Sequence, residues 1–272
     1  MKAHVNGITI AYNDRGIGLP IVFLHVFLHV FPLNLTMWEP QENALSSQSQ
    51  IITIDLRGHG ESDAPLWRYT LEQSAGDVNA LLNQLAIQQT LSVGFSMSGY
   101  ILFAFYQKYV TRAKGIILAN TRAQADTEEG KDGRFQMAQT AYNKGSASIA
   151  DIMLPTLLSP ATIQPRPEIV QHARAMIKGN QISGIAGDFM AMAERPGSIP
   201  LLKQITCPTQ IIIGELDQAS SQSVAKLMAD LIPNARLAII PNAAHLVNLE
   251  QPDTFNEIVA TFASELGHGK QT

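Results

Sequence analysis

Ser96 stands where an apolar run meets a segment of helical length, a position typical of a nucleophile. It directly follows the run Leu91–Phe95 and precedes Met97. A sharp turn from strand to helix strains the serine's backbone and exposes its hydroxyl, and the small residues Gly94 and Ser98 leave room for such a turn. The turn also places the serine at a helix N-terminus, where free backbone N–H groups can stabilise an oxyanion.

Asp217 and His245 are the partners that a nucleophilic serine requires, because a serine hydroxyl is a weak nucleophile until a base takes its proton. That base is ordinarily a histidine oriented by a carboxylate. Asp217 lies just beyond the apolar run Gln210–Ile213, and His245 lies in the loop after the last run, Arg236–Ile240. The sequence therefore predicts a catalytic triad of Ser96, Asp217 and His245.

The acid of this triad has alternative interpretations. Asp217 could instead cap a helix that begins near Ser220, and Asp126 is the second candidate for the acid. The position directly after the preceding apolar run is Asn120, whose amide cannot act as an anionic orienter.

The elements that must position these groups are short apolar runs alternating with amphipathic segments. Runs rich in Ile, Val and Leu and bounded by turn residues are typical of parallel strands buried on both faces. The expected strands are Ile21–Leu24, Ile51–Ile54, Leu91–Phe95, Gly115–Ala119, Gln210–Ile213 and Arg236–Ile240, and the expected helices are Leu71–Leu85, Ser98–Tyr109, Ser220–Leu231 and Thr254–Leu266. This alternation predicts an α/β fold with a mostly parallel, doubly wound sheet. Val5–Tyr12, with Asn6-Gly7 inside it, predicts an antiparallel hairpin at the sheet edge.

One long segment, residues 121–200, interrupts the alternation and contains no convincing strand. It predicts several short helices joined by loops that prolines mark. Its methionines and prolines include Met137, Met153, Met176, Met190, Met192, Pro155, Pro160, Pro165, Pro167 and Pro196. Such an insertion predicts a helical lid over the active end of the sheet, with a core domain made of residues 1–120 and 201–272. The methionines either line a substrate pocket or pack the core of this lid segment.

Together these motifs resemble those of the α/β-hydrolases, in particular the small lidded serine esterases and lactonases related to 3-oxoadipate enol-lactonase. The order Ser, Asp, His along the chain is the order found in that fold. The resemblance covers nearly the whole chain and is carried by five segments: His29–Trp38, Asp55–Ser62, the turn at Ser96, Gly214–Asp217 and Asn242–His245. It implies hydrolysis of a carboxylic ester or lactone through an acyl-enzyme on Ser96. No cofactor is expected, and a metal is disfavoured because no histidine–carboxylate cluster shows ligand spacing.

The resemblance also implies where an oxyanion would be bound. In that family the loop after the third strand usually reads His-Gly-aromatic-Pro, and the aromatic residue and the residue after the nucleophile each supply a backbone N–H. Met97 is therefore one expected donor. The other is Phe31, from His29–Pro32, or alternatively Phe27, because the unit Leu-His-Val-Phe occurs twice in tandem over residues 24–31. The added unit either extends a strand or lengthens the loop after it.

Two positions depart from the family pattern. Val30 (or Val26) stands where glycine is usual, and Ser98 stands where a second glycine is usual. A β-branched valine resists backbone angles that glycine tolerates, so the sequence predicts an intact triad beside an altered oxyanion loop. The alternative functions are a C–C bond hydrolase, perhydrolase or cofactor-free lyase that uses the same triad, or a slow-turnover ligand-binding protein.

Other side chains with reactive groups are interpreted mainly as structural. Arg122, where the lid segment begins, could bind a substrate carboxylate, although a surface salt bridge is the commoner role for such a residue. The remaining residues interpreted as structural are His25, His29, His59 and the single cysteine, Cys207.

Composition excludes several other classes of protein. The chain has 272 residues, of which 46% are hydrophobic and 15% are charged, and its formal net charge is -4. That charge gives no reason to expect a nucleic acid or an anionic membrane as partner. One cysteine excludes an internal disulfide, and no apolar stretch reaches the roughly 18 residues of a membrane span. Because the N-terminus lacks a secretory signal, a cytoplasmic location is expected. The family resemblance implies a small-molecule ester or lactone as substrate, and the oligomeric state is not indicated.

Overall fold

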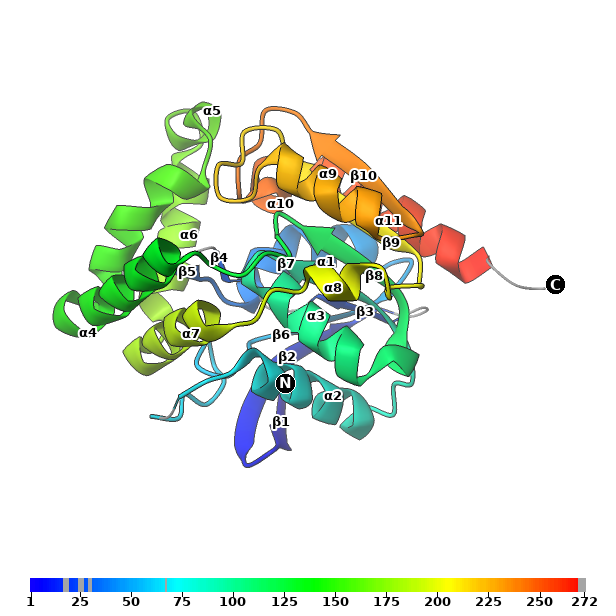
Figure 1. Ribbon diagram of the computed structural model, residues 1–272, viewed down its shortest axis with the longest axis horizontal. Helices are drawn as coiled ribbons and strands as arrows, with labels where there is room; N and C mark the ends of the chain where they lie inside the picture. The colour runs from blue at the N-terminus through cyan, green and yellow to red at the C-terminus, as the bar shows by residue number, and fades with distance from the viewer. Residues whose placement is uncertain (17–19, 24–26, 29–30, 67, 269–272) are drawn as a thin grey trace.

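A sheet of eight strands forms the centre of the computed structural model, which describes residues 1–16, 20–23, 27–28, 31–66 and 68–268. Its strand order is β1-β2-β6-β3-β7-β8-β9-β10 (Figure 1). The strands are β1 (Lys2–Val5), β2 (Ile8–Arg15), β3 (Pro20–Phe23), β6 (Gln50–Ile54), β7 (Thr90–Phe95), β8 (Ala113–Ala119), β9 (Thr209–Gly214) and β10 (Ala235–Ile240). All six strands expected from the apolar runs are present, within a few residues of their predicted bounds.

The sheet is parallel from β6 to β10 and antiparallel at its other edge. β3 pairs in parallel with β6 on one side and β7 on the other, whereas β2 pairs with β6 in the antiparallel sense. β1 and β2 form the predicted hairpin, whose turn residues Asn6 and Gly7 have φ of 49° and 78°. The strands β6, β3, β7, β8, β9 and β10 all run in the same direction. Their carboxyl ends therefore meet at one edge of the sheet.

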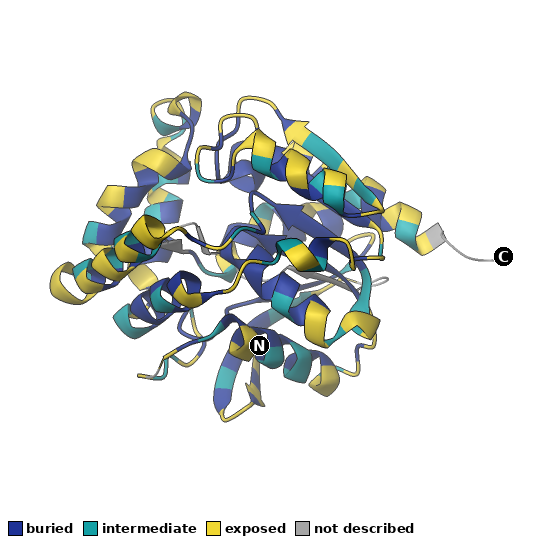
Figure 2. Cartoon of the chain, viewed as in Figure 1, coloured by how far each residue is buried: buried dark blue, intermediate teal, exposed yellow. Residues whose placement is uncertain are grey.

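Helices cover both faces of the sheet, as the alternating pattern predicts. In Figure 1, α2 (Leu71–Gln84), α3 (Met97–Lys108) and α9 (Gln222–Leu231) lie on one face, and α1 (Glu39–Leu45) and α11 (Pro252–His268) lie on the other. Figure 2 shows buried residues concentrated in the sheet and on the inner sides of these helices, with exposed residues on their outer sides. Short apolar strands between two helical layers therefore supply the hydrophobic core.

Helices alone connect β8 to β9, a stretch in which every residue is described. They are α4 (Glu128–Leu157), α5 (Pro160–Ile163), α6 (Pro167–Gly179), α7 (Ile182–Glu194) and α8 (Ile199–Leu202), and α4 to α7 lie to one side of the sheet (Figure 1). The expectation that prolines mark the loops is wrong at Pro155, which lies inside α4. That helix is interrupted instead at Gly145, whose φ of 79° is available to glycine at little cost.

The duplicated unit does not lengthen β3, which ends at Phe23. Phe27–Leu28 forms β4 and Phe31–Pro32 forms β5, and the two pair with each other as a separate antiparallel ladder. The backbone of this ladder therefore belongs to the connection that follows β3. His25, Val26, His29 and Val30 lie outside the described residues.

Residues 121–200, the predicted lid segment, pack against the rest of the chain where two glycines, Gly184 and Gly58, are in contact. A Cβ atom on Gly184 of α7 would lie 1.9 Å from the carbonyl oxygen of Gly58, and one on Gly187 would lie 2.8 Å from the Tyr69 ring. Beside this contact, the buried Asp188 lies 3.4 Å from Nδ1 of His59. Close backbone approach thus fixes α7 against the turn that follows β6. Among the described residues, no helix combines the length and apolar character needed to cross a membrane.

Candidate active site

Ser96 lies in the sharp turn between β7 and α3 that the sequence predicts. Its φ of 55° and ψ of -117° are unusual for a residue other than glycine. Its N–H donates to the carbonyl of Ala119 at 2.9 Å, and its own carbonyl accepts from the Thr121 hydroxyl at 2.7 Å. Bonds to the adjacent strand β8 and to the residues just after it therefore hold the strained backbone in place.

Glycines on both sides of Ser96 allow α3 to approach β7 and the residue Thr121, which follows β8, closely. A Cβ on Gly94 would lie 2.8 Å from the Ser98 carbonyl oxygen, and one on Gly99 would lie 2.3 Å from Oγ1 of Thr121. Ser98 fits this turn because its hydroxyl accepts from the Phe95 N–H at 2.8 Å and donates to the Phe95 carbonyl at 2.9 Å. The serine that replaces the usual glycine thus adds two hydrogen bonds to the turn.

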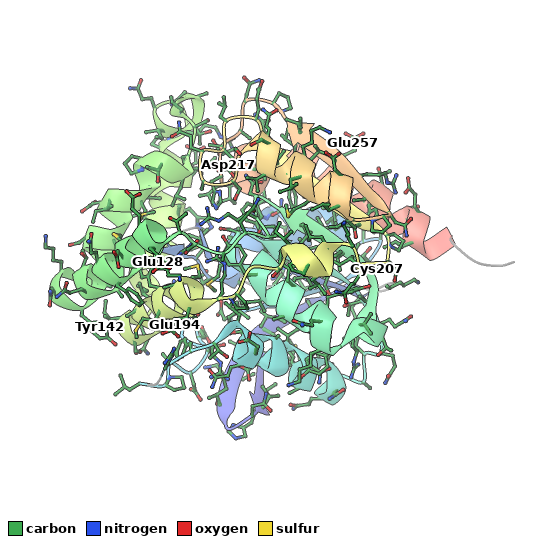
Figure 3. All side chains as sticks on the ribbon, in the orientation of Figure 1. Glu128, Tyr142, Glu194, Cys207, Asp217 and Glu257 are labelled. Atoms are coloured by element: carbon green, nitrogen blue, oxygen red, sulfur yellow. The ribbon has the colours of Figure 1, made fainter. Side chains whose placement is uncertain are left out.

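His245 and Asp217 meet Ser96 at the carboxyl edge of the sheet. Nε2 of His245 lies 2.9 Å from Oγ of Ser96, and its Nδ1 lies 2.9 Å and 3.0 Å from the two carboxylate oxygens of Asp217. The imidazole is fully buried and packs edge-on against Phe95. Figure 3 shows Asp217 in the loop between β9 and α9, on the side of the molecule that faces the lid helices. Of the three side chains named from the sequence, His245 is therefore within hydrogen-bonding distance of both Ser96 and Asp217.

Asn120 is a member of this network that sequence reasoning set aside. Its Nδ2 donates to Oδ2 of Asp217 at 2.8 Å and to the carbonyl of Ala244 at 3.1 Å. The backbone N–H groups of Ala219 and Ser220 donate to Oδ1 of Asp217. An amide cannot orient the histidine as an anion would, but it can hold the carboxylate that does. Its place at the end of β8, next to β9 in the sheet, was the available signal.

One of the expected oxyanion donors, Met97, lies directly after Ser96. Met97 is the first residue of α3, and the first N–H groups of a helix have no carbonyl partner within it. Phe31 and Phe27 lie in the short β5–β4 ladder that follows β3, and α3 contacts β4. The backbone of both candidates thus lies in the connection that the family resemblance indicates.

A cavity of about 530 Å³ lies between the start of the lid segment and the core. It is lined by Arg122, Gln124, Ala125, Asp126, Thr127, Gly130, Gly133, Arg134, Met137, Met153 and Val224. Met137 and Met153 therefore line a pocket, as one of the two interpretations of the methionines requires. The cavity opens beside the segment Asn120–Arg122, which also contacts Ser96 and Asp217.

Three arginines surround one carboxylate at this cavity. Arg122 contacts Asp126 at 2.5 Å and Arg195 contacts it at 2.9 Å, and Arg134 contacts it as well. Burial tends to raise the pKa of Asp126, but its bonds to Arg195 and Arg134 outweigh burial and hold that pKa below its usual range. Arg122 is partly buried, and its Nε is a buried donor without a partner among the described residues. Asp126 is thus paired with arginines and not with a histidine. Because three arginines surround this one carboxylate, the cluster carries excess positive charge.

Two residues interpreted as structural have surroundings that fit that role. His59 is fully buried, and its Nδ1 lies 3.1 Å from the carbonyl of Arg57. Cys207 packs partly buried against the core, and burial raises the pKa of its thiol to about 11, which leaves it protonated at neutral pH.

Comparison with known proteins gives the class that this fold and site define. Residues 20–252 match the family model of the alpha/beta hydrolase fold, and the chain belongs to that family. A solved structure of a thermophilic esterase from Thermogutta terrifontis, with malate bound, is 35% identical and superposes with a TM-score of 0.93 over 98% of this chain and 97% of that one.

Other relatives are lactonases. The enol-lactonase from Burkholderia xenovorans LB400 is 29% identical, with a TM-score of 0.89 over 97% of this chain and all of that one. 3-Oxoadipate enol-lactonase 2 of Acinetobacter baylyi is 29% identical over 234 residues, which make up 86% of each chain. The protein is a hydrolase of this family, and the predicted resemblance and fold class are confirmed.

Proposed function

We propose that this protein hydrolyses a carboxylic ester or lactone through an acyl-enzyme on Ser96, with Asp217 and His245 completing a catalytic triad. The observation that carries the proposal is the continuous chain from Oγ of Ser96 through both ring nitrogens of His245 to Asp217. The esterase and lactonase names of the relatives support the same reaction class.

In the proposed reaction, Oγ of Ser96 attacks the carbonyl carbon while Nε2 of His245 takes the hydroxyl proton. Asp217 accepts the Nδ1 proton in a hydrogen bond and stabilises the imidazolium. The N–H groups of Met97 and Phe31, with Phe27 as the alternative to Phe31, stabilise the oxyanion. His245 then protonates the leaving alkoxide, and water attacks the acyl-enzyme with His245 again as base.

We also propose that the chain is divided into a core, residues 1–120 and 201–272, and a lid, residues 121–200. The buried triad supports it, because Ser96 is 1% exposed and His245 is 0% exposed. A substrate must therefore reach Ser96 through space that the lid segment borders, and we assign selection among acyl and alcohol groups to that segment.

The arginine cluster favours a substrate that carries a free carboxylate on the part that occupies the cavity. Three guanidinium groups face one aspartate there, so a ligand carboxylate would reduce the excess of positive charge. Arg122 is the cluster member with an unpartnered buried donor, and a guanidinium binds a carboxylate through two parallel bonds. Met137 and Met153 would contact the apolar part of the same substrate.

A fluorophosphonate probe tests the triad, because it reacts only with an activated serine. We expect covalent labelling at Ser96, together with hydrolysis of 4-nitrophenyl esters, and we expect both to be lost in Ser96→Ala. The loss in kcat should be on the order of 10⁴-fold or more. Labelling without turnover of any ester or lactone, with turnover of a vinylogous diketone, would instead identify a C–C bond hydrolase. A folded protein that is not labelled would refute the proposal.

A further inference from the structure

Glu250 is a buried carboxylate that the proposed reaction does not use. It is the last residue of α10 (Val247–Glu250), it lies five residues after His245, and its side chain is 2% exposed. A buried carboxylate is costly unless its oxygens are fully hydrogen-bonded. Its partners therefore indicate what the residue is retained for.

One oxygen of Glu250 holds the loop that carries His245. Oε1 accepts from the backbone N–H of Ala244, the residue before the histidine, at 2.8 Å. The carbonyl of the same Ala244 accepts from Nδ2 of Asn120, which also donates to Asp217. The peptide groups on both sides of Ala244 are thus held, one by the core through Asn120 and one by Glu250.

The other oxygen of Glu250 holds the lid segment. Oε2 accepts from the backbone N–H of Ser159 at 2.8 Å and from Oγ1 of Thr162 at 2.8 Å. Ser159 lies in the short turn between α4 and α5 (Pro160–Ile163), Thr162 lies within α5, and both are buried. A parallel backbone bond joins the same regions, because Leu246 N–H donates to the carbonyl of Leu157 at 3.1 Å.

We propose that Glu250 is a positioning residue through which the seating of the lid segment sets the placement of His245 against Ser96. This inference rests on the proposed function, because it concerns the base of that triad. A single side chain bonds to the lid and to the peptide before the histidine, so a shift of the Leu157–Thr162 turn moves the histidine loop with it. Displacements of about 1 Å in a reacting group cost on the order of 10²-fold in rate.

The carboxylate is required because both of its oxygens face donors. In Glu250→Gln, the amide has one acceptor oxygen, so its NH₂ group must face the N–H of either Ala244 or Ser159. One of the two connections is then lost while the size of the side chain is kept. We expect kcat to fall about 10- to 100-fold with KM little changed, since the histidine and not the substrate contact is disturbed.

Thr162 provides the sharper test, because it contacts Glu250 from the lid. Thr162→Val removes the hydroxyl donor with little change in shape, and Thr162→Ser retains the donor as the matched control. With a small substrate such as 4-nitrophenyl acetate, Thr162→Val should lower kcat and the rate of fluorophosphonate labelling by about 3- to 10-fold, and Thr162→Ser should behave like the parent. Combined with Glu250→Gln, Thr162→Val should cause no further loss, because both act through one residue.

The outcomes separate this inference from the proposed function. A parent protein that is not labelled at Ser96 contradicts the triad itself. A labelled parent, with Thr162→Val folded and labelled at the parent's rate, overturns the role of Glu250 alone. Equal losses from Thr162→Val in the parent and in the Glu250→Gln background would also overturn it, since the two residues would then act independently.

Discussion

The charged side chains around the candidate site are paired, but the numbers of positive and negative charges differ between its two clusters. His245 has one carboxylate, Asp217, whereas Asp126 has three arginines. The excess of arginines over carboxylates at Asp126 is one of the observations behind the binding role that we propose for this cluster. Arg122, for which the sequence left two roles open, forms a salt bridge with Asp126, and its side chain is 23% exposed.

At the scale of single residues, the prediction concerns Arg122. Arg122→Gln should lower kcat/KM about 10- to 100-fold for a 4-nitrophenyl half-ester of a dicarboxylic acid, because a charged hydrogen bond to the free carboxylate is lost. Asp126 keeps Arg134 and Arg195 as partners, so the fold should tolerate the change. A neutral 4-nitrophenyl ester of equal chain length serves as the control and should be hydrolysed at the parent's rate. Equal losses on the two esters would show that Arg122 acts structurally.

Among the secondary-structure elements, α7 is the one whose placement depends most directly on residue size. It approaches the turn after β6 so closely that Gly184 has no room for a methyl group. β7 and α3 show the same requirement at Gly94, where an added Cβ would meet the backbone of Ser98 and Gly99. Contacts of this kind are stiff, since backbone cannot yield as a side chain can.

Gly184→Ala should therefore loosen the lid from the core. The added Cβ would lie 1.9 Å from the Gly58 carbonyl oxygen, so α7 must shift. We expect the free energy of unfolding to fall by about 1–3 kcal/mol, although alanine is the better helix former. Gly133→Ala in α4 is the control, because its Cβ meets nothing within 4 Å, and it should stabilise the protein slightly. Urea unfolding of both variants measures the difference, and a stabilised Gly184→Ala would disprove the close contact.

At the scale of the whole molecule, buried polar groups as well as apolar surface join the lid to the core. Glu250 joins the two at the histidine loop, and Asp188 of α7 meets His59 and lies near Arg57 on the core side. Burial raises the pKa of Asp188 well above its usual value, and Arg57 opposes that shift only in part. The interface therefore favours a neutral Asp188.

This interface makes stability depend on pH in a defined direction. The folded protein holds a proton on Asp188 at pH values where the unfolded chain has released it, so stability falls as pH rises from about 4 toward the raised pKa. In Asp188→Asn the side chain is neutral at every pH, and the free energy of unfolding should fall less over that range. Asp230→Asn, at an exposed position on α9, is the control and should follow the parent. Parallel pH profiles for the parent and Asp188→Asn, by urea unfolding, would contradict this account.

Local pattern was sufficient to predict the sheet, four of its flanking helices (α2, α3, α9 and α11) and the three triad candidates. Short apolar runs between turn residues identify buried strands, and parallel strands bring their carboxyl ends to one edge, where Ser96, Asp217 and His245 follow three of them. The 3₁₀ and short helices at Leu35–Trp38, Glu39–Leu45 and Val247–Glu250 were not predicted, because segments this short carry little periodicity.

The sequence by itself determined which residues follow which strands, because that depends only on order along the chain and on the period of the apolar pattern. Tertiary structure alone decided that Asn120 bonds Asp217, that three arginines converge on Asp126, and that Glu250 links the lid to the loop of His245. Asn120 and Asp217, which make the first of these contacts, are 97 positions apart in the sequence. No local propensity encodes such pairings, since they arise only when separate elements pack together and every buried polar group must find a partner.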